Sequence, residues 1–229
     1  MFANRIEAGQ KLAEKLKAYA GREDVLVLGV PRGGVPVAFE VATALRAPLD
    51  ILVLRKLGVP WQEELAFGAI AQGGVRVLDR KIMEMLSLTT AEVEQVAAKE
   101  QVELERREKA YRGDRPPLDV RGRTVILVDD GIATGSSMRA AIAALRQMTP
   151  ARIVLAVPVA PPSTCERLRA EVDELVCIDM PESFYAIGQF YLDFSPVGDE
   201  EVTDLLARAV ATATASAGRN AERGRPGSA

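Results

Sequence analysis

The sequence predicts a doubly wound α/β fold, in which helices cover both faces of a mostly parallel sheet. Short runs of aliphatic and β-branched residues alternate with segments whose apolar residues recur about every 3.6 positions. The short runs show no polar alternation, as expected for strands that are covered on both faces. At 229 residues, the chain is long enough to bury one core of this kind.

The predicted elements follow one another in βα order after an opening amphipathic helix over residues 6–19. Further helices are expected over residues 35–46, 137–148 and 163–171. Strands are expected over residues 25–30, 49–56, 75–78, 123–130, 151–160 and 173–178. Each predicted strand is a short apolar run, and each predicted helix carries one apolar face.

One long charged segment, residues 89–112, interrupts this alternation. Thr89 and Glu92 are spaced as a helix capping box, and Glu103 and Arg107 are spaced for an i,i+4 ion pair. We expect a helical insertion at about 79–113 that lies on the edge of the domain. Alternatively, this insertion is a lid or a dimerisation arm. A dimerisation arm would make the protein a homodimer.

The chain is expected to form a single domain over residues 1–212. Small and polar residues dominate from Ala211 onward, which predicts a disordered tail over residues 213–229.

The composition excludes several classes of function. The chain contains no histidine, which rules out Ser-His-Asp triads, Cys-His dyads and HExxH zinc sites. The formal net charge of −3 argues against specific binding of nucleic acid. No apolar run approaches the ~20 residues needed to span a bilayer, so we expect a cytoplasmic protein with no membrane partner. Cys165 and Cys177 lack metal-ligand spacing and are expected to be packing residues.

The stretch VILVDDGIATGSSM, residues 125–138, joins a predicted strand to a predicted helix. Gly131 and Gly135 permit a sharp turn, after which the amides from about Ala133 onward point into one concavity at the helix start. Three hydroxyl groups add further donors: Thr134, Ser136 and Ser137. With the helix dipole, these groups predict a phosphate site.

Two carboxylates precede this loop. When ionised, Asp129 and Asp130 are acceptor-only groups, which suit vicinal hydroxyls or Mg²⁺. The alternative is an acid pair in a small-residue turn, with Ser136 or Ser137 acting as a helix N-cap.

A second unusual segment, PRGG, follows the first predicted strand. Arg32 places a guanidinium beside Gly33 and Gly34, where an anion can approach the backbone closely at a helix start. A tight turn with a surface arginine explains the same residues about as well. Because ligands bind at the carboxyl ends of strands in open parallel sheets, both segments are candidates for one site.

Taken in their order along the chain, these segments resemble the motifs of type I phosphoribosyltransferases, and the resemblance spans residues 25–194. VILVDDGIATGSS is similar to the family motif that binds phosphoribosyl diphosphate (PRPP), and PRGG resembles the pyrophosphate loop, where the Pro31-Arg32 peptide is often cis. VLRKLG, residues 53–58, resembles a basic stretch near the pyrophosphate. PESFYAIGQFYLDF, residues 181–194, resembles the hood that covers the nucleobase, so a hood is expected at about 180–197.

The resemblance implies a core of about five strands and a role for each matching residue. Asp129 and Asp130 would hold the ribose hydroxyls and Mg²⁺, and the 5′-phosphate would lie on the following loop. The implied loop residues are Gly131, Ala133, Thr134, Gly135, Ser136 and Ser137. The pyrophosphate would be received by Arg32, Gly33, Gly34 and Arg55, with Arg32 and Lys56 acting as catalytic residues. The acceptor hood would include Phe184, Phe190, Tyr191 and Asp193.

The reaction implied is displacement of pyrophosphate from PRPP by a small nitrogen acceptor such as a nucleobase. It proceeds by positioning and electrostatic stabilisation, so the absence of histidine is no obstacle. A PRPP- or nucleotide-sensing regulator without turnover is the alternative, and a hydrolase or phosphorylase of a ribose phosphate is a third interpretation. The long stretch between Lys56 and Arg123 departs from the family's short flap, and the sequence does not identify the acceptor.

Overall fold

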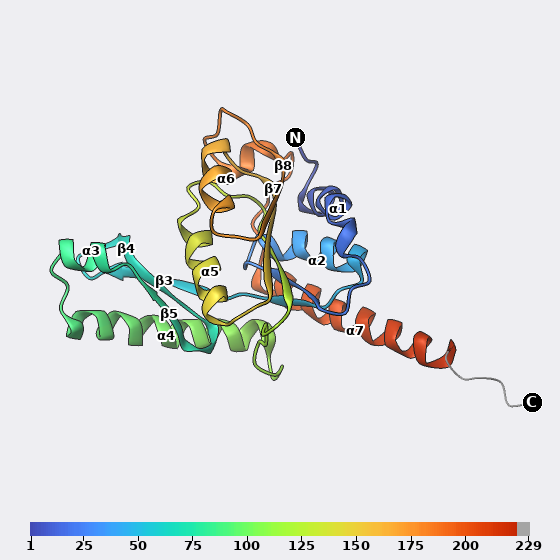
Figure 1. Cartoon of the computed structure of the whole chain (residues 1–229), viewed down its shortest axis with the longest axis horizontal. Helices are drawn as coiled ribbons and strands as arrows, with labels where there is room; N and C mark the ends of the chain where they lie inside the picture. The colour runs from blue at the N-terminus through green and yellow to red at the C-terminus, as the bar shows by residue number, and fades with distance from the viewer. Residues whose placement is uncertain (224–229) are drawn as a thin grey trace, which may run out of the picture.

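A five-stranded parallel sheet forms the centre of the molecule (Figure 1). The computed structural model describes residues 1–223 and, of these, the side chains of all but residues 63, 64 and 213–223. The strands of the sheet are β1 (Val25–Gly29), β2 (Leu49–Ile51), β6 (Thr124–Val128), β7 (Arg152–Val159) and β8 (Glu174–Asp179). They lie in the order β2-β1-β6-β7-β8, which confirms the doubly wound prediction.

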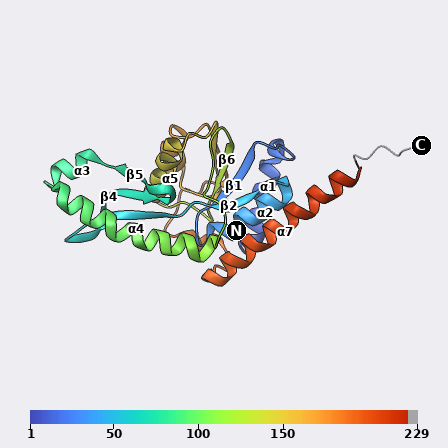
Figure 2. The ribbon, with the colours of Figure 1, turned by 90° about the horizontal axis from the view of Figure 1, so that it is seen from below.

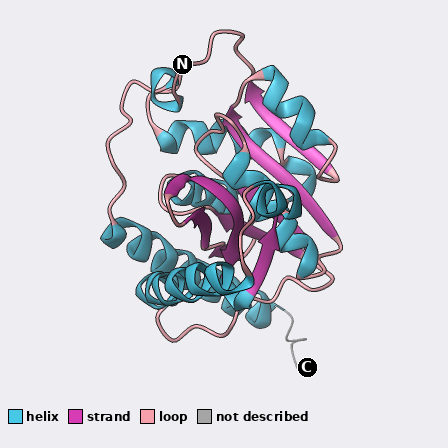
Figure 3. Cartoon of the chain, turned by 90° about the vertical axis from the view of Figure 1, so that its left-hand side faces the viewer, coloured by secondary structure: helices cyan, strands magenta, loops and turns pink. Residues whose placement is uncertain are grey.

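Helices cover both faces of this sheet, and β1, β6 and β7 are buried along their whole length except for Arg152 at the start of β7 (Figures 1 and 3). One face packs against α1 (Arg5–Lys15), α2 (Gly34–Leu45) and the start of α7 (Asp199–Arg223). The other face packs against α5 (Ser136–Gln147) and α6 (Pro162–Arg169). The two apolar clusters on either side of the sheet form most of the core.

The sheet changes winding direction between β1 and β6. From β1 the chain continues outward to β2, whereas from β6 it continues through β7 to β8 on the other side. Gly29 is the register partner of Val128, so the loops that follow β1 and β6 begin side by side. Ligands bind at such a switch point in doubly wound sheets.

Residues 54–112 leave the central sheet and form a separate arm (Figure 2). The arm contains an antiparallel sheet, in the order β3-β4-β5, and two helices. Its elements are β3 (Leu54–Val59), β4 (Gln62–Ala71), β5 (Val75–Leu78), α3 (Arg80–Met85) and α4 (Thr90–Arg112), with the short 3-10 turn η2 (Gln72–Gly74) between β4 and β5.

The predicted strand over residues 49–56 is therefore two strands in different sheets. The Leu52 amide still donates to Gly29 of the central sheet, but the Val53 amide donates to the side chain of Gln72 in the arm. The sequence is apolar across the break, which is why a single strand was predicted. The short strand at 75–78 also pairs in the arm and not in the central sheet.

The charged helix α4 begins at the expected capping box. The Thr89 amide donates to Glu92 at 2.8 Å, and the Glu92 amide donates to the Thr89 hydroxyl at 3.2 Å. Glu103 and Arg107 form the expected ion pair at 2.8 Å. Leu104 is fully buried, so α4 packs onto the arm and core along a narrow stripe.

The helix α7 extends to Arg223, beyond the expected domain boundary at 212. Residues 213–223 therefore continue a helix where a disordered tail was predicted, because an alanine-rich sequence favours helix even without large apolar residues. Residues 224–229 of that predicted tail lie outside the described residues. Within residues 1–223, no helix is both long enough and apolar enough to cross a membrane.

Candidate functional site

The loop between β6 and α5 presents a row of uncovered backbone amides. Among the described residues, the N–H groups of residues 133–137 have no hydrogen-bond acceptor in the protein. The loop is held from behind, because Thr164 donates to the carbonyl of Ala133 at 2.8 Å and Arg167 donates to that of Thr134 at 3.3 Å. The carbonyls of Ala133 and Thr134 are thus turned toward α6, and the free amides at the start of α5 are the kind of group that binds anions.

Gly135 sets the turn that produces this arrangement. Its φ is +81°, a left-handed conformation that side chains resist, and it occupies the N-cap position of α5. A Cβ atom at this position would lie 3.1 Å from the Thr164 methyl group. No side chain caps the helix here, so the alternative interpretation, in which Ser136 or Ser137 acts as the N-cap, does not hold. The Thr134 and Ser136 hydroxyls lie 3.4 Å apart on the same loop.

The two acids at the end of β6 have different environments. One oxygen of Asp129 accepts the Asp130 amide at 2.9 Å, and the Asp129 side chain lines a cavity beside the amide row. Burial and the neighbouring Asp130 charge raise the pKa of Asp129 above its ordinary value. A cation or several hydroxyl donors at this carboxylate would compensate for that burial.

Asp130 instead pairs with an arginine near the N-terminus. The Arg5 Nε atom lies 2.8 Å from the Asp130 carboxylate, and both side chains are about nine-tenths buried. Burial raises the pKa of Asp130, and Arg5 opposes that rise. Arg5 also donates to the carbonyl of Ser195 and stacks 3.9 Å from the Phe194 ring centroid. Through Arg5, Asp130 therefore connects the end of β6 with the N-terminal segment and with residues 194–195.

The PRGG loop packs directly against these acids. The Pro31-Arg32 peptide is cis, as the family resemblance implies. A Cβ atom on Gly33 would lie 2.1 Å from an Asp130 carboxylate oxygen, and one on Gly34 would lie 2.8 Å from the Val128 carbonyl. The two glycines thus allow the start of α2 to approach the end of β6 more closely than would be possible if either residue carried a side chain.

Arg32 points away from this loop toward the start of α7. Its guanidinium lies 3.5 Å from Asp199, which also accepts a hydrogen bond from Tyr111 at 2.8 Å. Arg32 does not line the cavity beside Asp129, although it is half exposed. To reach a pyrophosphate in that cavity, the Arg32 side chain would have to leave Asp199.

The cavity beside Asp129 has a volume of about 730 Å³ and lies between the central sheet and the arm. Its lining residues come from the ends of β1 and β6, from α5, β3 and α4. They are Val30, Pro31, Leu54, Arg55, Lys56, Gly58, Pro60, Gln95, Val96, Lys99, Glu100, Asp129 and Ser137. The volume is in the range of pockets that hold small-molecule ligands.

The two basic residues on β3 differ in their partners. Arg55 donates to Glu100 of α4 at 2.7 Å, and the Glu100 side chain is only 12% exposed. Lys56 is exposed on the cavity wall, and among the side chains that the structure describes no carboxylate lies close enough to pair with it. The positive charge of Arg55 is thus balanced by the inserted helix, whereas no carboxylate among the described side chains balances that of Lys56.

The predicted hood lies above α1 and does not line this cavity in the described part of the chain. Phe184 and Phe190 are half-buried against each other with ring centroids 5.0 Å apart. Tyr191 is buried, and its hydroxyl donates to the Asp130 carbonyl at 2.6 Å. Asp193 accepts the amide and hydroxyl of Ser195. Tyr191 and Asp193 therefore make internal contacts, and the other two aromatic side chains pack on the hood.

Sequence reasoning missed several residues that complete the site: Arg5, Glu100, Thr164, Arg167 and Asp199. Each reaches the site from an element far away along the chain, and Arg5 is separated from Asp130 by 125 residues. No local pattern marks such residues.

The site is better suited to hold a magnesium ion through one carboxylate than through a complete set of protein ligands. Asp129 lines the cavity and keeps one carboxylate oxygen that is not used by the Asp130 amide. In the part of the chain whose side chains are described, no group of three or more acids, cysteines or histidines could hold a metal ion. Mg²⁺ that is bound through one carboxylate and through phosphate oxygens of a substrate matches this arrangement.

The fold and the loop define a class of protein: a doubly wound α/β protein with a loop of uncovered amides and two acids at its switch point. Comparison with known proteins agrees. The phosphoribosyl transferase domain matches residues 3–195. A protein of Mycobacterium tuberculosis provisionally named a phosphoribosyl transferase is 46% identical over 209 residues, which are 91% of this chain and 47% of that protein. The structure of TT1426 from Thermus thermophilus is 44% identical with a TM-score of 0.81, and the match covers 90% of this chain and 98% of that one.

The chain therefore belongs to the phosphoribosyl transferase domain family. A further relative, the bifunctional protein PyrR of Roseiflexus, is 32% identical over 146 residues, which are 60% of this chain and 57% of that protein. The chain spans about half the length of the curated relatives it matches.

Proposed function

We propose that this chain is a Mg²⁺-dependent phosphoribosyltransferase, in which a nucleobase or related nitrogen acceptor displaces pyrophosphate from PRPP. One observation carries the proposal: the loop with uncovered amides at residues 133–137 reaches, through Ser137, the same cavity between the sheet and the arm that Asp129 lines. A phosphate binds the amides, and a sugar carrying hydroxyls binds the acid. PRPP carries both groups on one ribose.

In this proposal the backbone amides, the carboxylate and the basic side chains of the site each bind a different part of PRPP. The amides of residues 133–137 hold the 5′-phosphate, while Asp129 accepts the ribose hydroxyls. When bound, Mg²⁺ balances negative charge on the pyrophosphate next to Asp129. Lys56 and Arg55 line the opposite wall of the cavity, where the pyrophosphate would lie. Arg32 joins them only after it separates from Asp199.

The reaction breaks the bond between the anomeric carbon and the pyrophosphate oxygen, and the electron pair leaves with the pyrophosphate. A nitrogen lone pair of the acceptor forms the new bond to that carbon, and the nitrogen loses a proton to solvent. Negative charge grows on the leaving group as the bond breaks, so cations placed beside it lower the barrier. Lys56 is a lining cation whose charge is not balanced by a neighbouring acid among the described side chains, and it is therefore the first choice for this role.

A second candidate function is a PRPP- or nucleotide-sensing regulator without turnover. The observation that favours it is the pairing of Arg32 with Asp199 and of Arg55 with Glu100. Two of the three cations expected at the pyrophosphate thus already have acidic partners, which leaves less charge for a transition state.

Measurement of pyrophosphate release separates the two candidates. We expect release from PRPP with at least one acceptor in a panel of nucleobases and simple amines, and none when Mg²⁺ is omitted. Lys56→Ala and Arg32→Ala are expected to lower kcat more than PRPP affinity, because their charge acts on the leaving group. Release without any acceptor would indicate a hydrolase. Tight PRPP binding with no release for any acceptor would contradict the enzyme and favour the regulator.

A further inference from the structure

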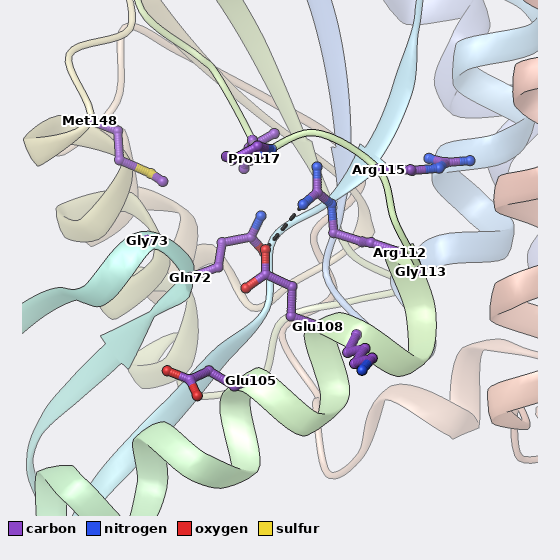
Figure 4. Close-up of a pocket in the computed structure, with 11 residues that line it drawn as sticks. Gln72, Gly73, Glu105, Glu108, Arg112, Gly113, Arg115, Pro117 and Met148 are labelled. Carbon is purple, nitrogen blue, oxygen red and sulfur yellow. Dashed lines mark hydrogen bonds and ion pairs between the residues drawn. The ribbon is translucent and has the colours of Figure 1, made fainter.

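A second cavity of about 380 Å³ lies where the arm joins the central domain (Figure 4). Its walls come from η2, the last turns of α4, the segment that follows α4, and the end of α5. None of its lining residues lines the cavity beside Asp129. The proposed PRPP site therefore does not account for it.

Gln72 contributes an unpaired donor to this cavity. The side chain is only 1% exposed, and its Oε1 atom accepts the Val53 amide at 2.8 Å. This bond fixes which amide atom is oxygen, so the Nε2 atom must face the other way. The Nε2 atom is buried and has no hydrogen-bond partner among the described residues. A buried donor left without an acceptor is energetically unfavourable, so an acceptor is expected there.

The neighbouring charges are already arranged around Arg112. Its guanidinium donates to both oxygens of Asp50 at 2.9 Å, to Glu108 at 3.0 Å and to the Pro116 carbonyl at 2.6 Å. These bonds use one oxygen of Glu108 and leave the other oxygen as an acceptor. Gln72 of η2 and Glu108 of α4 both line this cavity, and Figure 4 shows their side chains.

The remaining lining is mixed: Glu105, Lys109 and Arg115 are charged, and three apolar side chains lie among them. Met148 extends its sulfur toward the cavity, and Pro117 lies across from it (Figure 4). Leu118 completes this surface. The cavity thus combines a donor from Gln72, an acceptor from Glu108 and an apolar part formed by Met148, Pro117 and Leu118. Its volume is at the lower end of the range for small-molecule sites.

We propose that this cavity binds a small molecule with an amide-type edge, that is, a carbonyl beside an N–H group on a flat ring. A nucleobase with a lactam edge, or its nucleoside, has this chemistry. The carbonyl accepts from Gln72 Nε2, the N–H donates to Glu108, and the ring packs on Met148. The site goes beyond the proposed transferase site, because it shares no lining residue with that site.

Binding of uracil, hypoxanthine and their nucleosides to the full chain tests the proposal, measured by calorimetry and by ligand-detected NMR. We expect at least one of these to bind, and 1,3-dimethyluracil, which keeps its carbonyls but lacks N–H groups, to bind at least 10-fold more weakly than uracil. Gln72→Glu keeps an oxygen for the Val53 amide but removes the donor, and should weaken binding at least 10-fold. Gln62→Glu makes the same change at an exposed position of β4 and should leave binding unchanged.

Two further variants distinguish loss of ligand binding from misfolding, and binding in this cavity from binding at the transferase site. Met148→Trp should fill the cavity and abolish binding even if Gln72→Glu does not fold. Asp129→Asn should retain binding, because Asp129 belongs to the other cavity. Absence of binding for the whole panel at millimolar concentration would overturn the proposal. So would binding that is lost in Asp129→Asn and retained in Gln72→Glu, since the probe would then occupy the transferase site.

Discussion

Three glycines in the candidate site allow backbone segments to approach where a side chain would collide. Gly33 and Gly34 let α2 begin against the acids of β6, and Gly135 turns the chain into α5. Single side chains then hold these turns in place: Thr164 binds the loop from behind, and Arg5 pairs with Asp130. At the residue scale, the site therefore depends on close contacts made by small residues and on their distant partners.

Gly135→Val should weaken PRPP binding by about 100-fold. The branched side chain resists the φ of +81° and would push against Thr164, so the amide row loses its shape. Loss of two charge-assisted hydrogen bonds costs on the order of 3 kcal/mol. Titration calorimetry with Mg²⁺ present measures the affinity. Gly122→Val is the matched control, because Gly122 also has a positive φ, of +67°, but has open space around it. Equal affinity in both variants would place the phosphate elsewhere.

Arg5→Ala should lower the free energy of unfolding by about 3 kcal/mol, because it leaves the buried Asp130 carboxylate without its cation. Urea denaturation measures the change. Arg121→Ala removes an arginine from an exposed pair with Asp119, and is expected to cost less than about 1 kcal/mol. If the two variants lose the same stability, the Arg5–Asp130 pair does not stabilise the fold as described.

At the scale of elements, α4 does more than cover the edge of the domain. It reaches the candidate site through Glu100, which neutralises Arg55 of β3. It also reaches the central sheet through Arg112, which binds Asp50 of β2. The predicted inserted helix is thus a wall of the cavity.

Glu100→Gln should strengthen the binding of pyrophosphate by about 3- to 10-fold. The substitution keeps the shape of the side chain but removes the charge that balances Arg55, which leaves more positive potential in the cavity. Glu94→Gln is the control, since Glu94 pairs with Arg76 on an exposed part of the same helix. Calorimetry with pyrophosphate and Mg²⁺ compares the two variants with the wild type. Unchanged affinity in Glu100→Gln would show that Arg55 does not face the ligand.

At the scale of the whole molecule, two sheets enclose one cavity. The five-stranded sheet supplies the amide row and Asp129, and the arm supplies the basic residues and α4 (Figures 1 and 2). Between the two, Val53 and Gln72 exchange hydrogen bonds at the point where the chain crosses from β2 to β3. A ligand in the cavity must therefore contact both parts at once.

Hydrogen exchange with PRPP and Mg²⁺ should show slower exchange in two separate segments. We expect protection over residues 131–138, where the amides bind phosphate, and over residues 95–100 of α4, which line the same cavity. Residues 174–179, which form β8 at the edge of the central sheet, serve as the internal control and should not change. Protection confined to residues 131–138 would contradict a site shared with the arm.

The sequence predicted the parts of the fold whose causes are local. Buried strands such as β1 and β6 are continuous apolar runs, and the capping box at Thr89 fixed the start of α4. The strand predicted over residues 49–56 was wrong because apolar character does not reveal which sheet a strand joins. That choice depends on Gln72, which captures the Val53 amide from the arm.

By itself, the sequence determined the alternation of strands and helices in the central domain, the switch-point loops and the acids that follow β6, because backbone preferences and apolar periodicity act over short distances. It did not reveal β4 and α3 of the arm, or α7. Only the tertiary structure decided how the charges pair. Asp130 binds Arg5, Arg32 binds Asp199 and Arg55 binds Glu100, all through contacts between elements far apart along the chain. Ion pairs form where folding brings opposite charges together, and the spacing of these residues in the sequence does not indicate which charges will pair.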